Sequence, residues 1–179
     1  MMSTKFERQL DCAKTLADIF ELVKSAVTET IHLSRGGLML GMADLGNHPG
    51  MFFGAFYPVG TNIIVMNKVP LSRIKDTQPD LWKPYAFHVL LHEYLHTLGY
   101  LDEGLVGRRS YEITKEIFGE KHLATQIASD TVKFFPNLVY PNIAWQPEQL
   151  NVELVEDSID LALVTSRSWI LTEVSTIFV

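Results

Sequence analysis

The sequence predicts an α+β fold, on three patterns that follow one another along its 179 residues. An amphipathic helix pattern comes first, short segments rich in β-branched and aromatic residues follow, and a strongly apolar helix lies near the middle. This order predicts an N-terminal helix, a small mixed β-sheet with an edge strand, a buried helix and further helices that back it. The length fits one domain over residues 1–179, in which we expect 134–179 to form an extended segment and a C-terminal appendage.

The N-terminal helix is predicted over Phe6 to Ile31. Apolar residues recur there at intervals of three and four, and charged residues fill positions between them. Such a stripe is typical of a helix that covers a sheet with one face.

Three strands are predicted next, separated by loops rich in glycine, proline and asparagine. They cover Leu38 to Ala43, Met51 to Tyr57 and Thr61 to Asn67. The third has the strongest β pattern. It could offer an edge along which an extended peptide pairs through its backbone, or it could be plain sheet core.

The apolar helix is predicted over Pro84 to Leu98. Proline suits the first helical position because its missing N–H would have no partner there, and Gly99 suits the end because glycine turns the chain in the left-handed region. The polar stretch Ser72 to Lys83 predicts a connection. Further helices are predicted over Ser110 to Phe118 and His122 to Ala128, an extended segment over Phe134 to Pro147, and β-rich pieces over Val152 to Val155 and Ile177 to Val179.

Residues 92–96 read His-Glu-Tyr-Leu-His within the apolar helix. Side chains four apart lie on one face of a helix, so His92 and His96 can present two imidazole nitrogens to one metal ion. Glu93 lies about 100° further round the helix, where its carboxylate can take a proton from a water molecule beside the ion. Because buried histidines and a buried glutamate without partners are costly, the pattern predicts a bound cation, Zn²⁺, with Glu93 as the catalytic base.

A catalytic zinc ion takes a third protein ligand and leaves one position to water. After His96 the chain reads Thr-Leu-Gly-Tyr-Leu-Asp, which ends at Asp102. This spacing resembles the extended zinc motif of the metzincin metallopeptidases, and the aspartate is similar to that of the snapalysin-like enzymes. The resemblance implies His92, His96 and Asp102 as metal ligands and a zincin-like fold. Metzincins also carry a methionine turn downstream of the motif, whereas every methionine of this chain lies upstream, so the likeness is to the broader zincin group.

Two other residues compete with Asp102 for the third position. Glu116, with nineteen residues between it and His96, resembles the third ligand of the thermolysin-like gluzincins, with Glu120 in place of the expected aspartate. His122 resembles the distant third histidine of some minimal zinc peptidase domains. The alternative interpretation makes Asp102 a turn residue, Glu116 part of a solvated helix face, and His122 a cap or surface residue.

Further polar side chains could serve the same site. His88 lies one turn before His92 on the same face. It could hydrogen-bond a metal ligand, line the substrate-binding site, or be a hydrogen-bonded core histidine. Tyr100, Tyr111 or Tyr140 could donate a hydrogen bond to a developing oxyanion.

Together these patterns predict a zinc-dependent metallopeptidase that acts on a peptide or protein substrate. Two alternatives stay open. One is a metal-dependent hydrolase of another substrate, since a bacterial rRNA-maturation endoribonuclease family has a similar histidine spacing. The other is a non-catalytic domain that zinc braces, for which Asp102 and His122 together could complete four ligands.

The composition bounds the partners. With 47% hydrophobic and 20% charged residues the chain is ordinary for a globular protein, and its net charge of −6 does not favour nucleic acid. No apolar run is long enough to span a membrane, and the N-terminus has no secretory signal. A single cysteine, Cys12, fits a reducing compartment. We therefore expect a cytoplasmic protein without nucleic-acid or membrane partners, and the pattern indicates no particular oligomeric state.

Overall fold

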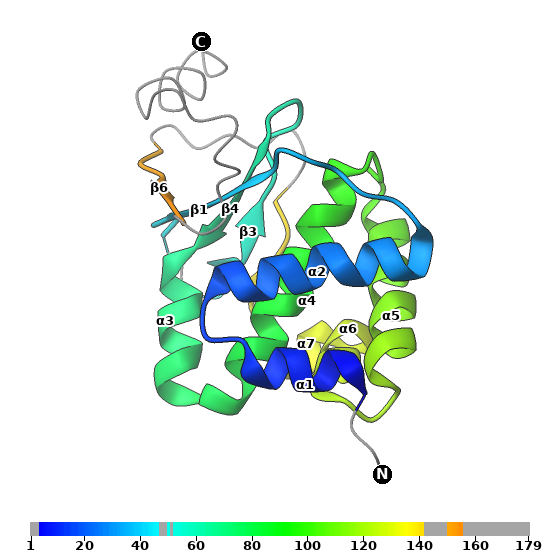
Figure 1. The fold of residues 1–179 in the computed structure, drawn as a ribbon. Helices are drawn as coiled ribbons and strands as arrows, with labels where there is room; N and C mark the ends of the chain where they lie inside the picture. Colours follow the sequence, from blue (N-terminus) through cyan, green and yellow to red (C-terminus); the bar gives the residue numbers. More distant parts are fainter. Residues whose placement is uncertain (1–3, 47–49, 51, 142–149, 156–179) are drawn as a thin grey trace.

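The protein is described by a computed structural model in which residues 4–46, 50, 52–141 and 150–155 are placed. These residues form an α+β fold with seven helices, a mixed four-stranded sheet and a two-stranded sheet (Figure 1). The helices gather on one side of the four-stranded sheet, and the helix that carries the histidine motif runs through the middle of them. None of the described helices combines the length and apolarity that a membrane span needs.

The four-stranded sheet has the order β3-β4-β1-β6. Strands β1 and β4 are parallel, whereas β3 pairs antiparallel with β4 and β6 pairs antiparallel with β1. Of the two alternatives for Thr61 to Asn67, the edge is therefore wrong and the sheet core is confirmed, because its strand has a neighbour on both sides. The strands are β1 (Met39–Ala43), β2 (Phe52–Phe53), β3 (Ala55–Phe56), β4 (Ile63–Asn67), β5 (Leu138–Val139) and β6 (Glu153–Leu154).

The predicted N-terminal helix is two helices, α1 (Lys5–Cys12) and α2 (Leu16–Ile31). The break comes from Thr15, whose hydroxyl accepts a hydrogen bond from the N–H of Asp18 while the Asp18 carboxylate accepts one from the N–H of Thr15. This capping box starts a new helix inside an uninterrupted apolar pattern.

The histidine motif lies on α4 (Pro79–Thr97), which follows α3 (Lys68–Thr77) after one residue. The prediction of a connection over Ser72 to Lys83 and of a helix start at Pro84 is thus wrong. Pro79 occupies the start instead, and Pro84 lies inside the helix. A proline this close to the N-terminus removes only one helical hydrogen bond, and burial of α4 compensates for that loss.

Helix α4 is the centre of the core. Every residue from Pro84 to Thr97 is buried, and the helix contacts α2, α3, strands β3 and β4, and the helices α5 (Glu103–Phe118) and α6 (Leu123–Ser129). Side chains in such a close-packed interior have few alternative rotamers. The core therefore holds the histidines on α4 in fixed positions.

The C-terminal part is partly described. The predicted extended segment from Phe134 begins at the end of α7 (Thr131–Phe134) and contains β5. Strand β6 confirms the β piece over Val152 to Val155. The remaining expectations, including the strand over Ile177 to Val179, lie outside the described residues.

Candidate metal centre

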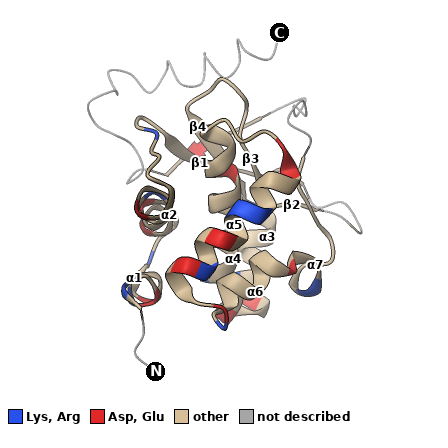
Figure 2. Cartoon of the chain, turned by 90° about the vertical axis from the view of Figure 1, so that its right-hand side faces the viewer, with Lys and Arg blue, Asp and Glu red and all other residues tan. Residues whose placement is uncertain are grey.

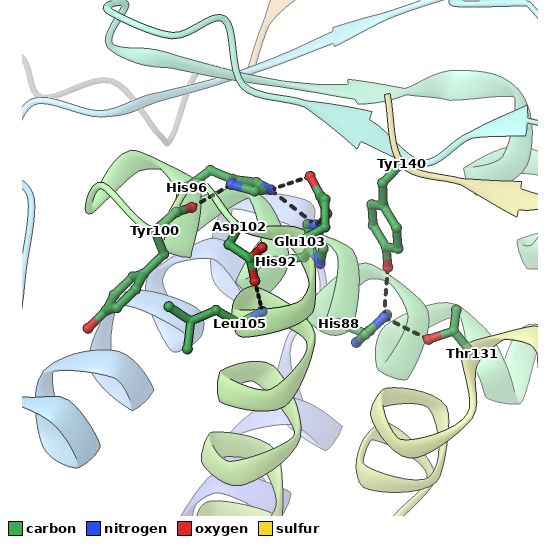
Figure 3. A network of polar contacts seen from close by, with 9 residues as sticks. All are labelled: His88, His92, His96, Tyr100, Asp102, Glu103, Leu105, Thr131 and Tyr140. Atoms are coloured by element: carbon green, nitrogen blue, oxygen red, sulfur yellow. Dashed lines mark hydrogen bonds and ion pairs between the residues drawn. The ribbon is translucent and has the colours of Figure 1, made fainter. Parts of the chain in front are cut away.

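His92 and His96 bring two imidazole nitrogens to one point on the buried face of α4. Their Nε2 atoms are 3.2 Å apart, and both side chains are almost fully buried. The carboxylate of Glu103, the first residue of α5, completes the group: Oε2 lies 2.9 Å from His92 Nε2, and Oε1 lies 3.2 Å from His96 Nε2 (Figure 3). Ligand atoms round a tetrahedral zinc ion are about 3.3 Å apart, given metal–ligand bonds of 2.0–2.2 Å. The three side chains therefore form a group that could hold a metal ion.

A neighbouring carbonyl fixes the tautomer of His96. The Nδ1–H of His96 donates to the backbone carbonyl oxygen of Tyr100 at 2.7 Å. A carbonyl only accepts, so Nδ1 carries a hydrogen, and in the neutral form of the ring Nε2 carries the lone pair. That lone pair faces an oxygen of Glu103, and two acceptors in contact need a proton or a cation between them. A divalent cation suits this arrangement because it accepts lone pairs from all three side chains.

Asp102 has a different role from the one that the resemblance implies. Its side chain is the N-cap of α5 and accepts a hydrogen bond of 2.7 Å from the backbone N–H of Leu105. Among the described residues, the group that could hold a metal ion contains Glu103 and does not contain Asp102. Asp102 thus caps the helix, and the adjacent Glu103 belongs to the candidate metal site.

The sequence analysis missed Glu103, although the chain carries a signal for it. Aspartate is a strong N-cap residue and glutamate is not, because only the shorter side chain reaches back to the N–H two or three residues on. In the dipeptide Asp102-Glu103 the first carboxylate therefore caps the helix, and the second is left to point elsewhere.

Glu93 lies beside this group but is not part of it. Its carboxyl group is buried, 3% exposed, and accepts a hydrogen bond from the backbone N–H of Tyr57, just after β3. Burial, together with the negative charge of Glu103, raises the pKa of Glu93 to about 8. The structure thus holds a carboxyl group of elevated pKa next to the three candidate ligands, which is typical of a general acid or base.

The charge states of the candidate ligands suit a metal ion. Burial lowers the pKa of His92, so its imidazole is neutral at neutral pH. Burial by itself would raise the pKa of Glu103, but hydrogen bonds and charge interactions with the two histidines outweigh it and lower the pKa. Neutral imidazoles and an ionised carboxylate are the forms that bind zinc.

The rival ligands are not brought to this point. Glu116 is exposed on α5. His122 is the N-cap of α6, where its Nδ1 accepts from the backbone N–H of Ala124 at 3.1 Å and its ring stacks on Phe118. Among the described residues, no other His, Cys, Asp or Glu joins the group of three.

His88 and the candidate oxyanion donors are also placed. His88 Nε2 lies 2.8 Å from the hydroxyl of Tyr140, so that hydroxyl is engaged by a histidine one turn before the candidate ligands. Tyr111 lies on α5 with the ammonium of Lys115 over its ring, and Tyr100 takes part through its backbone carbonyl. None of these contacts assigns an oxyanion donor.

No protein family, curated protein or solved structure matches the chain. What is shown is therefore an α+β fold with a buried His-His-Glu group that could hold a metal ion.

Proposed function

We propose that the protein is a zinc-dependent metallopeptidase with His92, His96 and Glu103 as the metal ligands and Glu93 as the general base. The observation that carries this proposal is the meeting of two imidazole Nε2 atoms and one carboxylate within 3.2 Å of one another, beside a buried carboxyl group. Two histidines and one carboxylate are a ligand set of catalytic zinc sites.

The charges of the site support a divalent ion. Glu103 and Glu93, when both are ionised, contribute one negative charge each, and an ion of charge +2 would balance them. When bound, zinc polarises a carbonyl group and lowers the pKa of a water molecule towards neutrality. Glu93 accepts the proton of the attacking water at a carboxylate oxygen and passes it to the leaving amine. The N–H of Tyr57 holds this carboxylate in place.

An open coordination position favours catalysis over a purely structural ion. A structural zinc ion has four protein ligands, and the described residues supply three at this point. Asp102 and His122, which could have completed a closed site, each hold a helix N-terminus instead. Peptide as the substrate follows from the resemblance of the motif to zincin peptidases and is the proposed class.

The charge distribution does not favour a nucleic-acid substrate. Acidic and basic side chains are mixed along α5, next to the candidate site, and form no continuous basic face in this view (Figure 2). A nuclease needs such a face to neutralise phosphates.

The variant Glu93→Gln tests the proposal. It keeps the size of the side chain and all three ligands, so zinc should bind as in the wild type, while hydrolysis of unstructured peptides should fall by about 10²–10⁴-fold. Zinc content and cleavage of a casein-derived peptide mixture are measured on the same samples, with Glu116→Gln as the matched control on an exposed face. Wild-type protein that binds no zinc, or a Glu93→Gln variant with full activity, would overturn the proposal. Zinc-dependent cleavage of RNA instead of peptide would replace it with the alternative hydrolase.

A further inference from the structure

Tyr140 covers one face of the His92 ring. The two rings are parallel to within 11°, and their centroids are 3.8 Å apart. This distance and angle describe a stacked pair. Tyr140 follows β5, so the stack joins α4 to a segment 48 positions further along the chain (140 − 92). Figure 3 shows its ring beside His92, with the hydroxyl pointing towards His88.

The hydroxyl of Tyr140 is itself anchored. Its oxygen lies 2.8 Å from His88 Nε2, and the same nitrogen lies 3.2 Å from Thr131 Oγ1. The Thr131 hydroxyl also donates to the carbonyl oxygen of Ile127 at 2.9 Å. His88 is 3% exposed. A partly buried chain of hydrogen bonds from α6 and α7 through His88 thus fixes the position of the tyrosine ring, and the ring lies flat on His92.

The two histidines are held in different ways. His96 is oriented by its Nδ1–H bond to the carbonyl of Tyr100. Within the described residues, His92 has no such bond at Nδ1, and its hydrogen-bond contacts are all made by Nε2, the atom that faces the candidate metal position. An imidazole needs some partner away from the metal to fix its ring angle, and this task usually falls to a carboxylate or carbonyl. At His92 the stacked ring of Tyr140 is the group in place to do so.

We infer that Tyr140 is a positioning residue, which holds the His92 ring at the angle that directs Nε2 to the metal. This inference rests on the proposed metal site. The aromatic ring supplies the contact with His92, and the hydroxyl group, bonded to His88, keeps the ring from sliding off it. Two substitutions separate the ring from the hydroxyl group. Tyr140→Phe keeps the aromatic ring and loses the hydroxyl, whereas Tyr140→Leu loses both.

The test compares zinc affinity across Tyr140→Phe, Tyr140→Leu and Phe134→Leu. Phe134 lies in the same part of the chain and makes its ring contact with Phe135, so Phe134→Leu controls for loss of an aromatic ring. Affinity is measured by competition with a chromophoric chelator, and the visible absorption of the Co²⁺-loaded protein reports the ligand geometry. We expect Tyr140→Leu to weaken zinc binding by about 10–100-fold and to change the Co²⁺ spectrum, since groups behind metal ligands have effects of this size. Tyr140→Phe should lose about threefold or less, and Phe134→Leu should match the wild type.

The outcomes separate this inference from the proposed function. Wild-type protein that fails to bind zinc overturns both. Wild-type protein that binds zinc, with Tyr140→Leu equal to it in affinity and spectrum, overturns the role of Tyr140 alone. If Tyr140→Leu does not fold, nuclear Overhauser effects between the Tyr140 and His92 rings in the zinc-loaded wild type decide instead: their presence supports the stack, and their absence overturns it.

Discussion

Asp102 accepts a hydrogen bond of 2.7 Å from the backbone N–H of Leu105, and this bond commits its carboxylate to the start of α5. The next residue, Glu103, is thereby the one whose carboxylate reaches the two histidines. Loss of Asp102 therefore removes a helix cap, and loss of Glu103 removes a candidate metal ligand.

Replacing each of them by alanine should separate stability from metal binding. Asp102→Ala removes an N-cap and should lower the free energy of unfolding by about 1 kcal/mol, or the melting temperature by about 2–4 °C, with zinc affinity within about threefold of wild type. Glu103→Ala should weaken zinc binding by more than about 100-fold, which is a larger loss than removal of a residue that only contacts a metal ligand causes. The stability of the metal-free protein should change little. Calorimetry and chelator competition measure the two effects. A stronger loss of zinc in Asp102→Ala than in Glu103→Ala would restore Asp102 as the third ligand.

The stability of the metal-free protein should depend on pH through His88. Burial, and to a smaller degree His92, lower the pKa of His88 from 6.5 to about 3. Between these values the unfolded chain binds a proton that the folded chain does not, so the free energy of unfolding rises with pH there, by up to about 1.4 kcal/mol per unit. This contribution is complete above pH 6.5 and is lost as the pH falls towards 3.

The variant His88→Gln isolates that contribution. It removes the titrating group, so its unfolding free energy should fall less steeply than that of the wild type between about pH 6 and pH 4. Urea unfolding in the presence of a chelator gives both curves, and their difference cancels the carboxylates that the two proteins share. Parallel curves would show that His88 does not take up a proton on unfolding in this range.

Asn67 should be one of the least replaceable polar residues. It is fully buried at the end of β4, where its Oδ1 accepts from the N–H groups of Leu45 and Val69 and its Nδ2 donates to the carbonyls of Gly46 and Phe53. In Asn67→Asp a buried carboxylate faces those two carbonyls, so we expect a loss of at least about 3 kcal/mol.

The matched control is Asn62→Asp, the same substitution at an exposed position. It should change the free energy of unfolding by no more than about 0.5 kcal/mol. Urea unfolding at neutral pH measures both variants. Equal small effects at the two positions would contradict the role of Asn67 as the link between β4 and the loop after β1.

The parts of the fold that depend on neighbours in sequence could be predicted. Strand β1 and strand β4 follow from β-rich segments between turn residues, and the shared face of His92 and His96 follows from helix geometry alone. The start of α2 was hidden because the capping box at Thr15 interrupts no apolar periodicity. The start of α4 was misplaced because two prolines, Pro79 and Pro84, offered the same signal.

Features that join distant segments could not be predicted in this way. The place of β4 inside the sheet depends on pairing with β1 and β3, which only the packed chain decides. The stack of Tyr140 on His92 likewise joins residues on separate elements. The role of Glu103 could be predicted in part. The sequence shows that Asp102 is the better N-cap, but the direction of the Glu103 side chain depends on how α5 packs against α4.

The three candidate ligands differ in their exposure to solvent. The side chains of His92 and His96 are 4% and 6% exposed, whereas that of Glu103 is 46% exposed. In the proposed metal site, a hydrated ion from bulk solvent would therefore contact the carboxylate of Glu103 before either imidazole. If the proposed site binds zinc, the rates of uptake and release should therefore depend on Glu103 more than on the buried histidines.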